Sequence, residues 1–502
     1  MDSIKFQGNG LTARNLLLTQ NGKNLEITFE TELIPKVILQ NFKLENLESL
    51  KASGAKPAVG NILFDGQTSI TDSFNVLDAN STETSLGIKN TVTFLNDLDN
   101  NITGLDNSDD VVNGQGGNDK INGLSGNDLL RGGAGSDILV GGAGNNTLVG
   151  DAGDDFLNVD YSTGNNLLSG GVGNDDLSAI ASTGDNLLNG GDGNDTLSAS
   201  GNTAFYDPNP DNPKDPSLGN NTLNGGAGDD FLSASYSSGD NLLNGGDCND
   251  TLSASGTDNR YDTPTSGNNI LNGGAGDDRL DVYLSTGNNL LSGGDGNDTI
   301  NGSTTGNDTI DGGTGDDLLS SRFYFGDYYP TEGITSTFNA TTNIGSITRG
   351  TNQVSYKNIE RLDILGTEYD DLIVGSNGND TLTGGDGGND TLYGGSGTDT
   401  FAFNSFNQGI DRLYDFNVTN ELIQVTAAGF GGGLSIGSLK TSQFTLGASA
   451  TTSTQRFIYN NITGALFFDQ DGSANAFTQV QFAQLSAGLS LTKNNFAVVY
   501  RD

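Results

Sequence analysis

The sequence of 502 residues contains no histidine, no tryptophan and a single cysteine, Cys248. Without histidine the chain cannot carry an H-E-x-x-H zinc site, a histidine-based catalytic triad or an imidazole metal site. One cysteine cannot form a disulfide within the chain. Because no other catalytic constellation stands out, we expect a protein without enzymatic activity.

Basic residues are also scarce, with 22 Lys and Arg against 63 Asp and Glu, which gives a formal net charge of -41. A chain this acidic repels itself when compact and offers no basic patch for nucleic acid. No run approaches the roughly twenty apolar residues of a membrane span. The first eight residues lack an apolar core, so we expect no Sec signal there.

A nine-residue repeat dominates the middle of the chain, from Gly114 to Ser320. Its pattern, Gly-Gly-x-Gly-x-Asp-x-apolar-x, is clearest in residues 123–131, 132–140 and 141–149. Glycine allows tight turns with positive φ, and the sixth-position aspartate supplies a hard oxygen ligand of the kind that calcium prefers. The eighth-position residues are predicted to point inward and form a core by stacking. They include Ile121, Leu130, Leu139, Leu148, Leu157, Leu168 and Leu177.

These residues resemble the calcium-binding nonapeptide of RTX, or haemolysin-type, proteins. The resemblance implies an all-β fold: a parallel β-roll with two nine-residue turns per coil, small flanking β-domains, and calcium held between neighbouring loops. Periodicity alone would also fit another solenoid. A glycine- and asparagine-rich disordered linker is a further alternative, but it would need neither leucine nor aspartate in fixed register. We expect disorder only in calcium-free solution.

The sixth position alternates between aspartate and asparagine, so one side of the roll is predicted to carry an unbroken aspartate column. The opposite side has asparagine from Asn146 to Asn289 and should be held by asparagine hydrogen bonds or water. In a second, short array both sides keep aspartate, pairing 371 with 390 and 380 with 399. The predicted calcium ligands are Asp119, Asp137, Asp155, Asp175, Asp195, Asp230, Asp250, Asp278, Asp298, Asp317, Asp371, Asp380, Asp390 and Asp399.

Turn lengths agree with this one-sided arrangement. From Asn166 to Asn289 the asparagine turns have eleven or more residues, and both large inserts, near 206–216 and 258–264, fall on them. A loop that clamps a metal tolerates extra residues poorly. The inserts are either tolerated surface loops or a binding surface. Cys248 replaces a turn glycine, and we expect a slightly strained site there.

Five regions follow from these patterns. Residues 1–100 are predicted to form an N-terminal β-domain or cap, 101–320 the main calcium-binding roll, and 321–365 a β-rich connector. Residues 366–403 form the second, short roll, and 404–502 a C-terminal β region. This last region resembles the serralysin-type C-terminal region, which implies a type I secretion signal.

Two strands are predicted around the Asn21–Gly22 turn, within residues 16–29, and a third within 36–42. The sequence as a whole favours a secreted calcium-binding structural or cell-surface protein, exported by type I machinery and folded by external calcium. Two alternatives remain: a polysaccharide-acting enzyme, or an adhesin whose partner is a cell-surface polysaccharide. In both, the roll would serve as an export and folding module.

Overall fold

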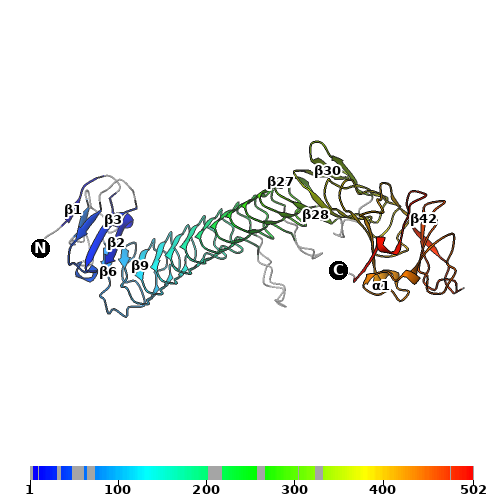
Figure 1. The fold of residues 1–502 in the computed structure, drawn as a ribbon. Helices are drawn as coiled ribbons and strands as arrows, with labels where there is room; N and C mark the ends of the chain where they lie inside the picture. The colour runs from blue at the N-terminus through cyan, green and yellow to red at the C-terminus, as the bar shows by residue number, and fades with distance from the viewer. Residues whose placement is uncertain are drawn as a thin grey trace. The chain divides into compact units, whose positions relative to one another are not determined.

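The computed structural model describes residues 4–8, 11–30, 36–47, 62–64, 74–201, 217–256, 266–303, 305–322, 332–474 and 476–500. Regular structure in these residues is almost entirely β (Figure 1). The chain divides into two compact units, Met1–Leu252 and Ser253–Asp502. The inserts near 206–216 and 258–264, and the aromatic segment 323–330, lie outside the described residues. No helix in the described part is long and apolar enough to cross a membrane.

The first unit begins with a small β-meander, in which β2 and β3 pair antiparallel and β3 pairs antiparallel with β4. Gly22 takes a φ of 59° in the turn between β2 and β3, as the predicted Asn-Gly hairpin requires. The hairpin and the third strand are confirmed. The elements before the roll are β1 (Ile4–Phe6), η1 (Ala13–Asn15), β2 (Leu16–Asn21), β3 (Asn24–Phe29), β4 (Val37–Leu39), η2 (Leu44–Asn46), β5 (Ile62–Phe64), β6 (Phe74–Val76) and β7 (Val92–Phe94).

The roll of the first unit consists of two parallel sheets, in which each strand pairs with the strand two places further along the chain. Six-residue strands build one sheet: β9 (Val111–Gly116), β11 (Leu129–Ala134), β13 (Thr147–Ala152), β15 (Leu167–Val172), β17 (Leu187–Asp192), β19 (Thr222–Ala227) and β21 (Leu242–Asp247). Three-residue strands build the other: β8 (Asn101–Thr103), β10 (Lys120–Asn122), β12 (Ile138–Val140), β14 (Phe156–Asn158), β16 (Asp176–Ser178), β18 (Thr196–Ser198), β20 (Phe231–Ser233) and β22 (Thr251–Ser253).

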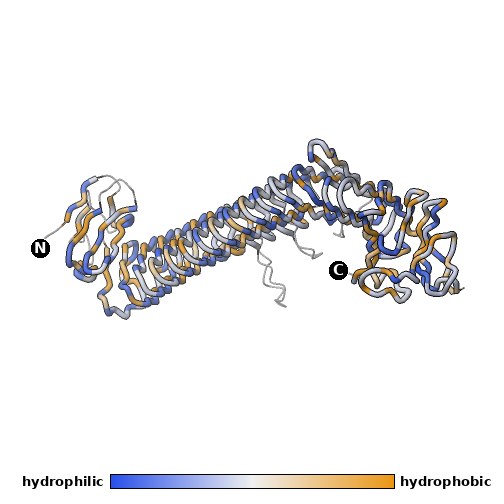
Figure 2. Tube along the Cα trace, in the orientation of Figure 1, coloured by the Kyte–Doolittle hydropathy of each residue, from blue (hydrophilic) through white to orange (hydrophobic). Residues whose placement is uncertain are grey.

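The core of this roll is a double row of leucines. Leu148 stacks in register on Leu168, and Leu168 on Leu188, in one sheet. Leu157 stacks on Leu177 in the other. These side chains are fully buried, and the seven predicted core residues are all at most 2% exposed. Apolar positions therefore recur along the strands, with hydrophilic turns between them (Figure 2). The predicted parallel β-roll is confirmed.

The meander and the first coil share one apolar cluster. It contains Phe29 from the meander, Phe64 from β5, Phe94 from β7, and Val111 and Leu129 from the roll. β7 also pairs with β9, the first six-residue strand of the roll. The end of the roll is thus buried rather than left as an open sheet edge.

The second unit has the same coil pattern. Within it, the sheet that contains β28 runs without a break through both repeat arrays. β28 pairs with β32, β32 with β34, β34 with β36, and β36 with β38, all in parallel. The predicted connector contributes β32 to this ladder and adds an antiparallel meander of β29, β30 and β31 on the other sheet. The two arrays are therefore joined within this unit by a continuous hydrogen-bonded sheet.

An aromatic core ends the second unit, in which Phe430, Phe457, Phe468 and Phe482 pack with ring centroids 5.1 to 6.1 Å apart. The elements of this unit are β23 (Ile270–Ala275), β24 (Arg279–Asp281), β25 (Leu290–Asp295), β26 (Thr299–Asn301), β27 (Asn307–Thr314), β28 (Leu318–Arg322), β29 (Thr335–Asn339), β30 (Ile344–Arg349), β31 (Asn352–Lys357), β32 (Arg361–Leu365), β33 (Leu372–Val374), β34 (Thr381–Thr383), β35 (Thr391–Tyr393), β36 (Thr400–Phe403), β37 (Asp411–Leu413), β38 (Leu422–Thr426), α1 (Ala427–Phe430), β39 (Gly437–Ser438), η4 (Thr441–Gln443), β40 (Phe444–Leu446), β41 (Phe457–Tyr459), β42 (Ala465–Phe468), β43 (Val480–Gln484), η5 (Lys493–Asn495) and β44 (Phe496–Val499).

Candidate cation-binding turns

The sixth-position aspartates of the roll form a hydrogen-bonded column. The backbone N–H of Asp137 donates to Oδ1 of Asp155 at 2.7 Å, and that of Asp155 donates to Oδ1 of Asp175 at 2.8 Å. The same bond repeats from Asp119 to Asp250 in the first unit and from Asp278 to Asp317 in the second. One carboxylate oxygen of each coil is therefore fixed by the coil before it. Within each unit, the predicted aspartate column is present.

The second oxygen, Oδ2, is buried in these turns and accepts no hydrogen bond from the protein. This state is shared by Asp119, Asp128, Asp137, Asp155, Asp175, Asp195, Asp230, Asp298, Asp317, Asp390 and Asp399. A buried acceptor without a donor costs about 1–3 kcal/mol, and more when it is charged. A hard cation would remove that cost, because oxygen atoms are the ligands that it prefers.

Backbone carbonyl oxygens converge on the same points. A Cβ built on Gly225 would lie 2.2 Å from Oδ2 of Asp230 and 2.7 Å from the carbonyl oxygen of Gly245. Only glycine fits at this first position of the turn. Among the described residues, no three acidic or cysteine side chains gather into one metal-binding group. The donor set therefore consists of single carboxylates together with backbone carbonyls, which suits calcium rather than zinc.

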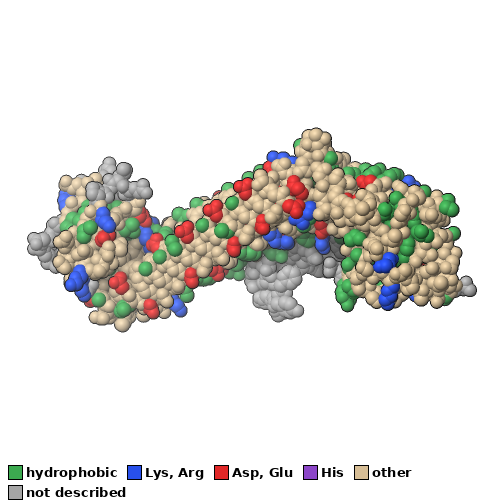
Figure 3. Space-filling view, in the orientation of Figure 1, with side chains coloured by type: hydrophobic (Ala, Val, Ile, Leu, Met, Phe, Trp, Pro, Cys, Tyr) green, Lys and Arg blue, Asp and Glu red, His purple; other side chains and the backbone are tan. Residues whose placement is uncertain are grey.

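Burial raises the pKa of these carboxyl groups, and the charges of neighbouring aspartates raise it further. The pKa reaches about 8 for Asp119, about 7 for Asp155 and about 6 for Asp230. These buried groups differ from the acidic side chains on the roll surface, which are coloured red in Figure 3. A group whose anion is destabilised in this way gains most from a bound cation.

The opposite edge carries a ladder of asparagine side chains. Nδ2 of Asn166 donates to the carbonyl oxygen of Gly164 at 2.9 Å and to Oδ1 of Asn186 at 2.8 Å. Equivalent bonds join Asn186 to Asn221, Asn221 to Asn241, and Asn269 to Asn289. Here an amide NH2 group supplies the positive partner that the aspartate edge lacks. The structure thus contains the predicted asparagine hydrogen bonds.

Not every sixth-position aspartate resembles those of the column. Oδ2 of Asp371 accepts from the N–H of Thr367 at 2.7 Å, and Oδ2 of Asp380 accepts from the N–H of Ser376 at 2.6 Å. Both are predicted calcium ligands, and both are paired in the predicted register, since the N–H of Asp380 donates to Oδ1 of Asp399 at 3.0 Å. Their carboxylates are hydrogen-bonded within the protein.

Several acidic residues that the predicted ligand set omits occupy comparable positions, among them Asp128, Asp411 and Glu421. Asp128 has an unsatisfied, buried Oδ2 although it lies on the edge that carries asparagine from Asn146 to Asn289. Asp411 accepts a 3.1 Å hydrogen bond from the N–H of Asp390, so it extends the Asp371–Asp390 pairing beyond the last repeat. Burial raises the pKa of Glu421 to about 7. The 21-residue spacing from Asp390 was the only sequence signal for Asp411.

Cys248 is exposed and takes a φ of 81°, in the left-handed region that disfavours side chains. Equivalent positions in other turns carry glycine with positive φ, such as Gly228 at 127°. The strain predicted at this turn is therefore present.

The RTX calcium-binding nonapeptide repeat matches this chain over residues 104–139, 131–160, 162–179, 178–202, 217–235, 237–261, 265–284, 282–304, 303–322, 365–401 and 385–407. No curated protein matches the chain. Among solved structures, the chain is similar to the extracellular lipase LipA from Serratia marcescens, with 17% sequence identity and a TM-score of 0.16. That alignment covers 57% of this chain and 45% of the lipase chain, so the chain spans less than half of the lipase.

Proposed function

Because this chain belongs to the RTX calcium-binding nonapeptide repeat proteins, we propose that it is a secreted structural or cell-surface protein whose roll folds on binding calcium outside the cell. The observation that carries the proposal is the column of buried carboxylate oxygens without hydrogen-bond donors. Calcium bound to these oxygens supplies the missing positive charge. Its binding free energy then becomes folding free energy, because the unfolded chain has no preformed site.

The same observation supports a one-sided calcium ladder. On the aspartate edge, residues such as Asp155, Asp175 and Asp195 present an unpaired carboxylate oxygen. On the asparagine edge, the amide groups already satisfy the turn carbonyls. Calcium should therefore bind mainly along the aspartate edge. The asparagine edge needs no ion, and this explains why the long turns and inserts of this sequence are found there.

Export and folding are linked in this proposal by net charge. At -41, the chain repels itself when compact unless cations neutralise its carboxylates. In a cytosol with little free calcium, the chain would stay unfolded and suitable for type I export machinery. Outside the cell, abundant calcium would then close the roll and lock the fold.

A calcium titration followed by far-ultraviolet circular dichroism tests the proposal on the full chain. We expect little β signal in chelator and a cooperative rise with calcium, with magnesium much less effective because it demands a smaller octahedral site. A chain that is already folded in chelator, or that responds equally to both ions, would contradict calcium-driven folding.

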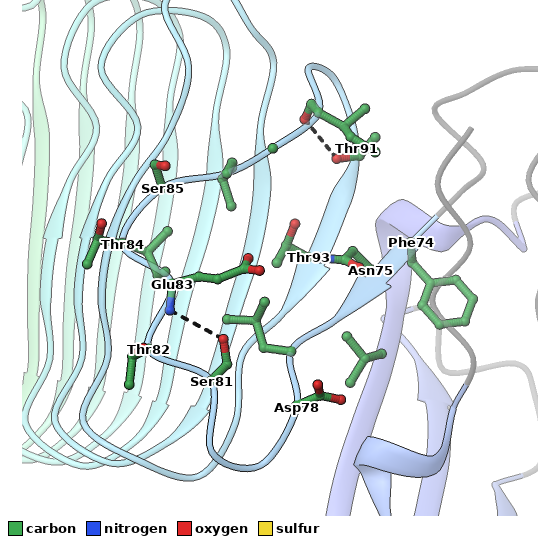
Figure 4. Close-up of a pocket in the computed structure, with 16 residues that line it drawn as sticks. Phe74, Asn75, Asp78, Ser81, Thr82, Glu83, Thr84, Ser85, Thr91 and Thr93 are labelled. Atoms are coloured by element: carbon green, nitrogen blue, oxygen red, sulfur yellow. Dashed lines mark hydrogen bonds between the residues drawn. The ribbon is translucent and has the colours of Figure 1, made fainter. Parts of the chain in front are cut away.

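A pocket in the first unit favours a second candidate function, an adhesin-type binding site. Its volume is about 520 Å³, and hydroxyl and carboxyl side chains dominate its polar lining (Figure 4). Asp78, Ser81, Glu83 and Thr93 are among the residues that line it. Hydroxyl and carboxylate groups can form hydrogen bonds with the hydroxyl groups of a saccharide, so a cell-surface polysaccharide is the candidate partner.

Binding to a panel of polysaccharides distinguishes this candidate from a purely structural role. Retention by one polysaccharide that is lost in Glu83→Ala, with the calcium-dependent circular dichroism unchanged, would support the pocket. Binding that survives this substitution would remove the pocket from the proposal, and turnover of the bound polysaccharide would favour the enzyme alternative.

A further inference from the structure

We propose that the backbone conformation of the second residue in each turn decides whether its sixth-position aspartate is a calcium ligand. Where the second residue has positive φ, its N–H turns away and Oδ2 is left for a cation. Where it does not, its N–H closes the turn by donating to Oδ2. This inference rests on the proposed calcium-binding function and assigns its sites residue by residue.

The turns with an unsatisfied Oδ2 all have a second residue in the left-handed region. Gly171, two places before the fourth-position Gly173, has a φ of 126° in the turn of Asp175. Three of these second residues are not glycine. Gln115, Leu124 and Asp151 have φ values of 78°, 70° and 75° in the turns of Asp119, Asp128 and Asp155. Side chains in this region are strained, and strain maintained at one repeated position points to a functional requirement.

The closed turns have second residues outside that region. Leu105, Ser303, Thr367 and Ser376 are absent from the residues with positive φ. Their N–H groups donate to Oδ2 of Asp110 at 2.8 Å, of Asp308 at 3.0 Å, of Asp371 at 2.7 Å and of Asp380 at 2.6 Å. Hydroxyl groups add to three of these turns, for example Ser376 Oγ, which donates to Oδ1 of Asp380 at 2.7 Å.

Two assignments follow that the alternation of aspartate and asparagine does not give. The turns of Asp371 and Asp380 are closed by hydrogen bonds to their carboxylates and need no ion. Asp128, which lies on the otherwise cation-free edge, is a calcium ligand. A cation at a closed turn would have to displace a charge-assisted hydrogen bond and leave a buried N–H unpaired, which disfavours binding.

Two carboxylates on one edge of the second array allow a matched test. Asp399 is open and Asp380 is closed, and their turns are hydrogen-bonded neighbours. In the full chain, we expect Asp399→Asn to lose at least one equivalent of bound calcium by equilibrium dialysis and to need more calcium to reach half of its β signal. We expect Asp380→Asn to keep the wild-type stoichiometry while its melting midpoint in saturating calcium falls by about 2–4 °C. Asp128→Asn and Asp308→Asn form a second pair with the same expected contrast.

Equal loss of calcium in Asp380→Asn and Asp399→Asn would overturn the inference, as would retention of all the calcium in both Asp399→Asn and Asp128→Asn. If one of these variants does not fold in calcium, the pair Asp128→Asn and Asp308→Asn decides the outcome. A wild type that binds no calcium would instead refute the proposed function. Such a chain would be folded in chelator, and its melting midpoint there would report whether the closed carboxylates hold their turns by hydrogen bonds.

Discussion

Replacement of one core leucine by alanine tests the register of the roll. Leu188 is fully buried and stacks between Leu168 and Leu223, its partners in the neighbouring coils. Its sequence neighbour Leu187 lies in the same strand, faces the other side of the sheet and is 37% exposed. Both variants, Leu188→Ala and Leu187→Ala, remove the same atoms, so any difference between them comes from burial.

The expected magnitude follows from the atoms removed. Leucine to alanine deletes three carbons, worth about 0.8 kcal/mol each when fully buried, and the remaining cavity adds to the cost. We therefore expect Leu188→Ala to lower the free energy of unfolding by about 3 kcal/mol. Leu187→Ala, at a partly solvated position, should cost about 1 kcal/mol or less.

Urea unfolding in saturating calcium, followed by circular dichroism, measures both values. Each coil contacts only its neighbours, so the loss should appear as a lower midpoint with a similar slope. Equal costs for the two variants, or a larger cost for Leu187→Ala, would refute the inward register of the eighth-position residues.

Three further predictions concern the turns. Asp195→Asn should raise the calcium concentration at which half of the β signal appears, because an amide replaces the charged carboxylate whose unpaired oxygen would bind the ion. Asn186→Asp should lower the melting midpoint in saturating calcium by breaking its bonds to Gly184 and Asn221; an unchanged calcium requirement in Asp195→Asn would contradict the edge assignment. The native pKa values of Asp119 and Asp155, about 8 and about 7, lie above the unfolded value. Without a cation, their contribution to stability is therefore present at low pH and lost as pH rises through these values, whereas bound calcium needs the deprotonated form. The calcium concentration required for folding should therefore fall between about pH 5 and pH 8; a rise would oppose this. Cys248→Gly should stabilise the protein by about 1 kcal/mol, because glycine adopts the positive φ of this position without the strain that a side chain causes. A loss of stability would mean that the cysteine packs favourably.

Periodicity predicted stacked coils and their register, whereas the resemblance to the RTX nonapeptide indicated which solenoid they form. A leucine two places after each sixth-position residue predicts an inward row, and Leu148, Leu168 and Leu188, one coil apart, are paired in one sheet. The connector was harder to predict, because it has no repeat. Only the structure shows that β32 continues the ladder while β29, β30 and β31 turn back on themselves.

The candidate site was predictable by residue type but not by hydrogen bonding. Aspartate at the sixth position indicates an oxygen ligand, yet Asp380 and Asp399 share that position and differ in the N–H that faces Oδ2. This difference depends on φ at the second residue. Ser376 as second residue indicates a closed turn, and the turn from Gly104 to the closed Asp110 has one residue more than the turn from Gly123 to the open Asp128. Residue type at the second position alone does not settle the outcome, because Leu105 and Leu124 have the same side chain and differ in φ.

The positions of bound calcium along the chain test the central claim most directly. Crystals grown with calcium and measured by anomalous scattering would place each ion against a named turn. We predict ions beside the turns of the aspartate column, from Asp119 to Asp250 and from Asp278 to Asp317, and none beside the asparagine turns from Asn166 to Asn241. Ions on both edges alike, or no ions beside the aspartate column, would contradict the account.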